Sequence, residues 1–466
     1  MPSRFNGICA AGLLAWACVA HHAAAADLVE VWRAAAQNDA DYAVGRAAGA
    51  QAQPRRDQAS ALWKPTVGLT AAVGVASSET ETRGAQFSAP GFGQSNNVGF
   101  GTSVTGGTSS RWAVAAMQPL YDPQRRAQQR QLNLSADLAD QQWRAAGQSL
   151  MLRTAERYFD LALAQETLHV LRRQLDAVQR AATEAQDRFK LGSVPVTDTH
   201  EAGARLAGVR AQVLAAESEL EIKRSGLADS TGLAPAALVA RMPAGAVVAD
   251  AAALPPLDRW LSDARAGNPA LQTQRLAAEV ARQEAGKYSR RASATVDLVV
   301  QAGRDRLSGS GDFGPASNTA TNRMIGIQLS VPLYSGGYRD AKQEEALRQA
   351  DQASAEVDRT RIQVGQQVRA AWLGLSVGAE RVRALEEALT ASLARRDATQ
   401  LGLEVGERTT LDLLNAENDA ASARLALAQG RVGLLLDRLR LQALAGRLDE
   451  AALRGVDAEL EAAAAD

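Results

Sequence analysis

The chain has 466 residues, a formal net charge of −1, and 46% hydrophobic but only 4% aromatic residues. The near-zero charge excludes both the strongly basic surface that binds nucleic acid and an acidic solvating tail. Few aromatic residues together with abundant alanine are unlike an ordinary large enzyme and indicate long, closely packed helices.

Residues 1–26 have the pattern of a secretory signal peptide, with a basic residue, a short apolar run and small residues from Ala23 to Ala26. Both cysteines, Cys9 and Cys18, fall inside this segment, so we expect no disulfide and no thiolate metal site in the mature chain. Cleavage is favoured over lipid attachment at Cys18, because the bulky Trp16 precedes it. Beyond the signal, no apolar run reaches the ~18 residues that a membrane-spanning helix requires.

The first part of the mature chain, residues 27–256, combines helical periodicity with alternating, strand-like patterns. Its predicted elements are a helix at 27–62, a strand at about 66–77, an exposed Gly/Ser/Thr/Asn-rich loop at 78–110, a strand at about 111–120, a long helix at 122–191 and a returning helix at 197–230. The two long helical stretches are separated by a turn at Gly192 to Pro195.

The second part, residues 257–466, repeats this order, so the chain is predicted to contain two copies of one unit. Its predicted elements are a helix at 257–291, a strand at about 294–303, a loop at 304–322, a strand at about 323–333, a long helix at 338–402 and a returning helix at 410–444. Thr295 to Leu298 matches Thr66 to Leu69, and Asn268-Pro269 matches Asn38-Asp39. Short segments at 231–256 and 441–466 close the two repeats.

The strand at 323–333 has the cleanest alternation, with apolar side chains on one face at Ile325, Ile327, Leu329 and Val331. Strands of about ten residues with one apolar face fit an outer-membrane barrel, in which lipid-facing and lumen-facing positions alternate. A soluble sheet with one solvated face fits the alternation equally well. The signal peptide, the loops and the long helices favour the membrane. Because four strands cannot close a barrel, several chains must then share one.

Three stretches, Val331 to Gly337, Arg188 to Asp198 and Leu403 to Asp412, together with the duplicated unit, resemble the TolC family of outer-membrane efflux and secretion channels. The resemblance implies a mainly α chain with a membrane β-barrel contribution. It implies a homotrimer with a shared 12-stranded barrel, four strands per chain, and a long periplasmic α-helical barrel. The expected location is the outer membrane of a Gram-negative bacterium, in contact with lipid. The expected partners are an inner-membrane ABC transporter or other pump, a periplasmic adaptor protein and the exported substrate.

The resemblance also implies a gate at the periplasmic helix turns. Transferred position by position, the acidic ring of the family falls on Asp412 and Asn415. The polar links of the family fall on Arg408, Thr197 and Asp198. These five residues are the candidate site of the sequence.

Two departures from the family pattern change what this gate is expected to do. Asn415 replaces an aspartate and Leu403 replaces a tyrosine, so the gate is expected to be less charged and differently latched. Helix capping is the competing interpretation, because Thr409 and Asp412 have capping-box spacing and Asp198 suits a helix start. Capping and a ring role are compatible with each other.

We expect no catalysis, no cofactor and no metal site. Gly309 to Gly314 has the spacing of a dinucleotide-binding loop, but Pro315 and a loop follow it instead of a helix. His169 and His200 are isolated, and two separate histidines make no metal site.

The leading hypothesis is therefore a passive conduit that serves type I secretion of a protein, including a toxin. In lacking a well-formed lipoprotein signal, the chain resembles the secretion branch of the family more than the often lipidated drug-efflux branch. The first alternative is the outer-membrane component of a multidrug efflux pump. The alternative from another class is a periplasmic coiled-coil scaffold without a pore.

Overall fold

The computed structural model describes residues 27–243, 254–289, 294–312 and 314–460. The predicted signal peptide lies outside the described residues, as do parts of the closing segments. The chain divides into two compact units, which we call the sheet unit (46–143 and 269–362) and the helical unit (1–45, 144–268 and 363–466). Each unit takes chain from both predicted repeats, so a repeat does not correspond to one compact unit.

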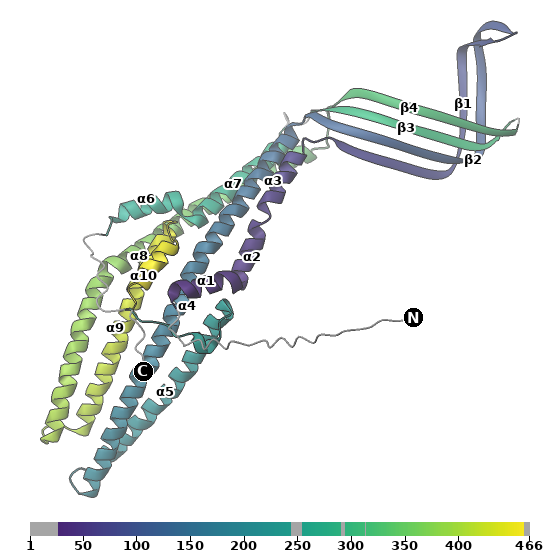
Figure 1. Cartoon of the computed structure of the whole chain (residues 1–466). Helices are drawn as coiled ribbons and strands as arrows, with labels where there is room; N and C mark the ends of the chain where they lie inside the picture. Colours follow the sequence, from purple (N-terminus) through teal and green to yellow (C-terminus); the bar gives the residue numbers. More distant parts are fainter. Residues whose placement is uncertain (1–26, 244–253, 290–293, 313, 461–466) are drawn as a thin grey trace, which may run out of the picture. The chain divides into compact units, whose positions relative to one another are not determined.

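The sheet unit contains four antiparallel strands in the order β1-β2-β3-β4, which lie side by side in Figure 1. The strands are β1 (Thr66–Ala89), β2 (Gly93–Tyr121), β3 (Thr295–Gly311) and β4 (Gly314–Ser330). The helices of this unit are α3 (Ala52–Ala61), α7 (Pro269–Lys287) and the first parts of α4 (Pro123–Lys190) and α8 (Tyr338–Glu404). The predicted order of helix, two strands and long helix is thus present twice.

The prediction of long loops at 78–110 and 304–322 is wrong. β1 and β2 continue to a short turn between Ala89 and Gly93, and β3 and β4 continue to a turn after Gly311. Ser, Thr and Gly carry no alternating pattern in these stretches, but backbone pairing between neighbouring strands satisfies their N–H and C=O groups regardless of side chain. The outer parts of β1 and β2 turn away from the four-stranded sheet (Figure 1), and the β1–β2 register shifts between Ala76 and Ser78.

β4 ends at Ser330 and not at residue 333. Pro332 lacks the backbone N–H that a strand ladder needs, and it restricts the residue before it. The segment that follows contains Gly336 and Gly337, both with positive φ, and α8 begins at Tyr338. The long helix therefore begins at the predicted residue, whereas the strand before it ends three residues earlier than predicted.

The helical unit consists of α1 (Leu28–Asn38), α5 (Val196–Thr231), α6 (Leu257–Gly267), α9 (Thr410–Leu444), α10 (Glu450–Asp457) and the later parts of α4 and α8. The short α2 (Ala40–Gly49) runs across the boundary to the sheet unit. With 68 and 67 residues, α4 and α8 confirm the predicted long helices. α5 returns alongside the end of α4, and α9 returns alongside the end of α8, so each pair forms a helix hairpin (Figure 1).

The core of the helical unit joins α1, α4, α5, α9 and α10. Tyr158 and Phe159 of α4 are fully buried there, with ring centroids 5.6 Å apart in an edge-to-face arrangement. The Tyr158 hydroxyl accepts a hydrogen bond of 2.8 Å from the Arg241 amide, which satisfies its buried oxygen. Burial raises the pKa of Tyr158 to about 12, so this residue stays neutral at physiological pH.

The internal repeat is also visible in α1 and α6, which have 11 residues each and end at Asp39 and Asn268 with the same extended backbone. Asn268 therefore matches Asp39, one position from the predicted match with Asn38. Burial raises the pKa of Asp39, but hydrogen bonds from the Tyr42 amide and from Arg153 outweigh burial, and the net pKa is lowered. A charged, bonded residue in one repeat thus occupies the place of an amide in the other.

We expect replacement of Gly446 by alanine to destabilise the protein by about 2 kcal/mol or more. Gly446 lies two residues after the end of α9 with φ +71°, and an added Cβ would lie 2.1 Å from the Gly267 carbonyl oxygen at the end of α6. The measurement is the thermal unfolding midpoint of the detergent-solubilised protein by circular dichroism. The control is Gly455→Ala in α10, where a Cβ meets nothing within 4 Å and helix propensity improves. Equal unfolding midpoints for the two variants would contradict this account.

Candidate functional site

The strand register places the predicted apolar positions on one face of the sheet, because directly opposed residues in an antiparallel pair point to the same side. The opposed pairs on this face include Ile325 with Val300, Ile327 with Leu298 and Leu329 with Val296, and Val67 with Ala116 and Leu69 with Val114. Ala116 also pairs with Val300, which joins all four strands into one apolar face. The apolar side chains that alternate along each separate strand therefore form one continuous surface.

The apolar face is exposed in the single chain: Ile325, Ile327 and Leu329 are 75%, 71% and 66% exposed. A contiguous apolar patch of this kind marks a surface that lipid or protein covers in use. On β4 it begins after Arg323 and ends with the strand at Ser330, a length of ~24 Å at ~3.4 Å per residue, close to the ~25 Å apolar band of an outer-membrane barrel. Contact of Ile325, Ile327, Leu329 and Val331 with lipid stays a prediction, and Val331 lies one residue beyond the end of β4.

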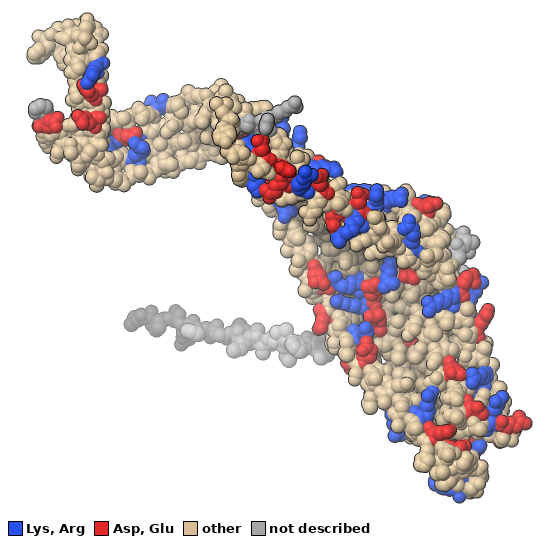
Figure 2. Space-filling view, turned by 180° about the vertical axis from the view of Figure 1, so that it is seen from behind, with Lys and Arg blue, Asp and Glu red and all other residues tan. Residues whose placement is uncertain are grey.

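The opposite face of the sheet has mainly small and polar side chains, together with Met117, Val299 and Met324. Opposed pairs on this face are Gly68 with Ala115, Thr70 with Ala113, Gly303 with Ala113, Gln328 with Asp297 and Gln301 with Met324. Arg111 and Asp305 face each other here and form an ion pair. Figure 2 shows few charged side chains over the strands and many over the helices. A barrel with this face inside would have a wide, wet and weakly charged interior.

Both edges of the sheet have backbone groups that need partners from outside the chain. Within the described residues, β1 pairs only with β2, and β4 pairs only with β3. Unpaired edge N–H and C=O groups are costly in lipid, where no water replaces the missing partner. The sheet is therefore incomplete as a membrane structure unless its edges meet further strands.

The two helix hairpins of the helical unit end in the same kind of turn. Gly192 and Gly406 have φ values of +72° and +80°, a left-handed conformation that glycine adopts without strain. The amide of Gly192 bonds to the Phe189 carbonyl, and that of Gly406 bonds to the Leu403 carbonyl. Gly192 and Gly406 therefore occupy equivalent positions in the two hairpins.

Asp412 caps α9, as the competing interpretation predicted. The Thr409 hydroxyl accepts from the Asp412 amide at 3.1 Å, and the Thr409 amide donates to Oδ2 of Asp412 at 3.0 Å. These bonds lower the pKa of Asp412, with a further contribution from Arg408, so the carboxylate is charged at neutral pH. Both bonds to the Asp412 carboxylate, from the Thr409 amide and from the Thr409 hydroxyl, use Oδ2, and the side chain is partly exposed. The capping role therefore leaves a charged oxygen free for a second role.

The remaining gate candidates lie at or near the hairpin turns but do not form one cluster in a single chain. Thr197 and Asp198 are in the first turn of α5, where a carboxylate is stabilised by the helix dipole. Arg408 packs over Gly402, since a Cβ at Gly402 would lie 2.6 Å from Cγ of Arg408. Within the described residues, no hydrogen bond or ion pair joins Arg408 or Asp412 to Thr197 or Asp198. A link between them stays a prediction for neighbouring chains.

The two departures from the family pattern have different environments. Asn415 is exposed on α9, one helical turn after Asp412, and adds no charge to that face. Leu403 is only 5% exposed, so it packs inside the hairpin and presents no polar group to a partner. The predicted loss of a tyrosine-type latch at Leu403 is consistent with this burial.

Sequence reasoning missed a polar contact between the hairpins. Nε2 of Gln174 on α4 lies 3.3 Å from Oδ1 of Asn418 on α9, and Gln174 is buried. This contact lies beside an alanine-rich core cluster of α4, α5 and α9 that includes Ala181, Ala185 and Leu414. Nothing in the sequence marks Gln174 as different from the many other polar residues of α4.

The described residues offer no site for a resident metal ion, since they contain no group of three or more His, Cys, Asp or Glu side chains placed as ligands. Among the helices in the described ranges, none has the length and apolarity required to cross a membrane.

Comparison with known proteins identifies a family and several relatives. The family described as outer membrane efflux protein matches residues 31–233 and 260–447, one segment in each predicted repeat. The chain is 29% identical to outer membrane protein TolC of Vibrio cholerae over 70% of this chain and 74% of that protein. It is 29% identical to the alkaline protease secretion protein AprF of Pseudomonas aeruginosa, over 74% and 71% of the two chains.

Two further comparisons cover almost the whole chain. The proteases secretion protein PrtF of Dickeya chrysanthemi is 27% identical over 92% of this chain and 90% of its own length. The crystal structure of the Campylobacter jejuni CmeC outer membrane channel superimposes with a TM-score of 0.69 at 15% identity, over 93% and 90% of the two chains. The second comparison concerns the fold alone.

Proposed function

Because the chain belongs to the outer membrane efflux protein family, we propose that it is the outer-membrane channel of a type I secretion system. The family consists of non-enzymatic channels of the Gram-negative outer membrane with helices that extend into the periplasm. The resemblance to the TolC family and the expected location are thereby confirmed. The exported cargo in this proposal is a protein.

The observation that carries the proposal is the near full-length similarity to a protein named for protease secretion, PrtF, which covers 92% of the chain. A second relative, AprF, is named for the secretion of an alkaline protease. The small side chains on the inner face of the sheet also support it. A polypeptide needs a wide passage without strongly charged walls, on which a charged segment would be retained.

We propose further that three copies share one barrel. The unpaired edges β1 and β4 are complementary in an antiparallel ring, since β4 of one chain can pair with β1 of the next. Three chains with four strands each give the twelve strands that the family resemblance implies. An inner-membrane transporter and a periplasmic adaptor protein complete the proposed pathway, and the energised transporter selects the cargo.

Multidrug efflux is the second candidate, because the family description itself names efflux. A pore-free periplasmic scaffold is the weaker alternative. It leaves the continuous apolar face of the sheet without a function, and it does not agree with the family's outer-membrane location.

Deletion of the gene in the bacterium that carries it tests the proposal. We expect one or more proteins to disappear from the culture medium while susceptibility to toxic small molecules stays unchanged. The measurements are mass spectrometry of the medium and growth inhibition by a panel of drugs. A plasmid copy of the wild-type gene should restore secretion. Drug hypersensitivity with an unchanged set of secreted proteins would contradict the secretion proposal and support multidrug efflux instead.

A further inference from the structure

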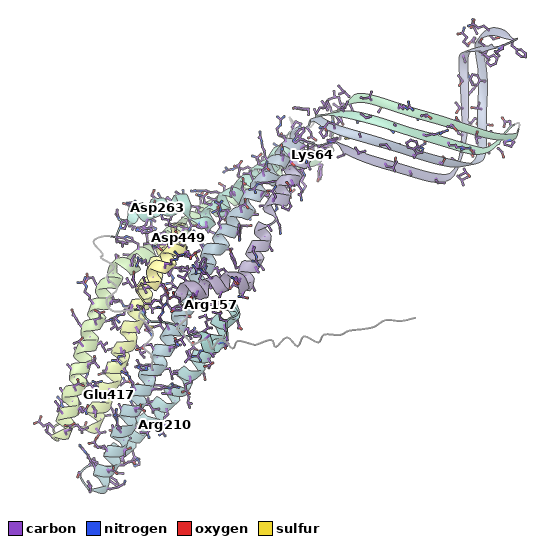
Figure 3. All side chains as sticks on the ribbon, in the orientation of Figure 1. Lys64, Arg157, Arg210, Asp263, Glu417 and Asp449 are labelled. Carbon is purple, nitrogen blue, oxygen red and sulfur yellow. The ribbon has the colours of Figure 1, made fainter. Side chains whose placement is uncertain are left out.

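A cavity of about 280 Å³ lies in the helical unit between α4, α8 and α9. It has room for several waters or one small anion. Its charged lining residues are Arg173, Asp176, Arg180, Arg396, Glu417 and Arg424. Four cationic and two anionic side chains from three helices therefore line one open cleft, with Arg173, Asp176 and Arg180 exposed and the other three partly buried. Figure 3 labels Glu417 on α9.

The cavity exists because small side chains line the facing helices. Ala177 of α4 and Ala420 and Ala421 of α9 form part of its wall. On α9 the spacing of Glu417, Ala420, Ala421 and Arg424 is that of one helix face, so all four point in one direction. The alanines leave room, and the longer charged side chains extend around it.

The positive charges in this cavity are only partly compensated. Arg396 is bonded to Asp397 at 2.6 Å and lies 4.0 Å from Glu417. In the part of the chain that the structure describes, no hydrogen bond or ion pair within 4 Å engages the guanidinium groups of Arg173, Arg180 or Arg424. With Asp176 and Glu417 counted, the lining still has two more positive than negative charges, and an anion among the arginines reduces their mutual repulsion.

We propose that this cavity binds a multivalent oxyanion of the phosphate type. Guanidinium groups match phosphate oxygens with paired, charge-assisted hydrogen bonds, and arginine is the preferred residue for this geometry. The anion contacts α4 of the first hairpin and α8 and α9 of the second hairpin. It therefore links the two hairpins at the level where Gln174 contacts Asn418. This binding does not depend on which cargo the channel carries.

Substitution of Glu417 provides a variant that is expected to bind the anion more tightly than the parent protein. It is half-buried in the cavity wall, 4.0 Å from Arg396, and its carboxylate opposes an incoming anion. Glu417→Gln removes this opposing charge and retains a side chain of similar size. Binding of the anion is therefore expected to become tighter in this variant, whereas loss of a merely structural residue has no reason to strengthen binding.

Isothermal titration calorimetry of the full-length, detergent-solubilised protein with inorganic pyrophosphate at constant ionic strength tests the proposal. We expect saturable binding with one site per chain. Arg424→Gln and Arg173→Gln should each weaken it about tenfold, the effect of losing one charge-assisted hydrogen bond. The matched control is Arg381→Gln, an exposed arginine of α8 outside the cavity, which should bind as the parent does.

The possible outcomes separate the site from general charge screening. Saturable binding that is weakened in the two cavity variants, retained in Arg381→Gln and tightened in Glu417→Gln supports the proposal. Absence of saturable binding, or equal losses in Arg424→Gln and Arg381→Gln, overturns it. Arg424→Lys should retain part of the affinity, and a misfolded Arg424→Gln protein would be recognised by circular dichroism and replaced by Arg173→Gln.

Discussion

Arginine in place of Ile327 is expected to prevent stable insertion into the outer membrane, at a cost of about 2 to 4 kcal/mol per chain near the bilayer midplane. Ile327 lies near the middle of the apolar face on β4, between Ile325 and Leu329, and pairs with Leu298. Every copy in a shared barrel carries the same defect, so the cost is multiplied by the number of chains. The measurement is the amount of folded, heat-modifiable oligomer in isolated outer membranes.

The neighbouring residue supplies a matched control. Gln328 lies on the opposite face and pairs with Asp297, so arginine there meets a wet surface and an opposite charge. We expect Gln328→Arg to insert at the parental level and to restore secretion in the deletion strain. A greater loss of folded oligomer for Gln328→Arg than for Ile327→Arg would mean that the two faces of the sheet are assigned the wrong way round.

Neutralising Asp412 is expected to abolish most cation block of the channel. If copies of the chain surround one axis, their Asp412 carboxylates converge at the hairpin tips, and a ring of carboxylates attracts multivalent cations. Asp412→Asn removes the charge and keeps a side-chain oxygen that can accept from the Thr409 amide, so the helix cap is retained. The measurement is single-channel conductance in planar bilayers with increasing concentrations of a trivalent cation.

Thr409→Ala is the control that separates the ring from the cap. It removes the hydroxyl that accepts from the Asp412 amide, at a cost of about 1 kcal/mol in helix stability, but leaves the carboxylate charge. Cation block should therefore persist in Thr409→Ala. If Asp412→Asn and Thr409→Ala both retain the parental block, capping is the only role of this pair.

Arg408 is expected to act on closure and not on cation binding. Within the described residues its guanidinium has no hydrogen bond or ion pair, and its side chain packs over Gly402 at the turn. A charge-assisted bond from Arg408 to the Thr197 region of a neighbouring chain would hold the tips inward. Arg408→Ala should then raise the leak conductance without loss of the oligomer. Unchanged conductance would show that the transferred latch does not operate in this protein.

The sequence by itself was sufficient for features that depend on local periodicity. The alternation at Ile325, Ile327 and Leu329 predicted one apolar face, and the strand register confirmed it because side-chain direction has a period of two. The lengths of α4 and α8 followed from an unbroken helical pattern. The Thr409–Asp412 cap was also predictable, since both partners lie within one helical turn.

The predicted loops at 78–110 and 304–322 show where local information ends. Serine, threonine and glycine are compatible with either a loop or a strand, and these stretches are strands because a neighbouring strand supplies the backbone hydrogen bonds. The match of Asn268 with Asn38 failed by one position for a related reason. Only the shared backbone at the ends of α1 and α6 shows that Asp39 is the true counterpart.

Tertiary structure alone decided which charges share one environment. Arg173, Arg396 and Arg424 are separated by up to about 250 residues, and each stands in a helix rich in similar solvated charges. A charged side chain has the same local pattern whether it faces water or a cavity, so the sequence contains no sign of their meeting. Packing of α4, α8 and α9 around small alanines brings them together, because helix contacts are determined by the shapes of three surfaces and not by any one of them.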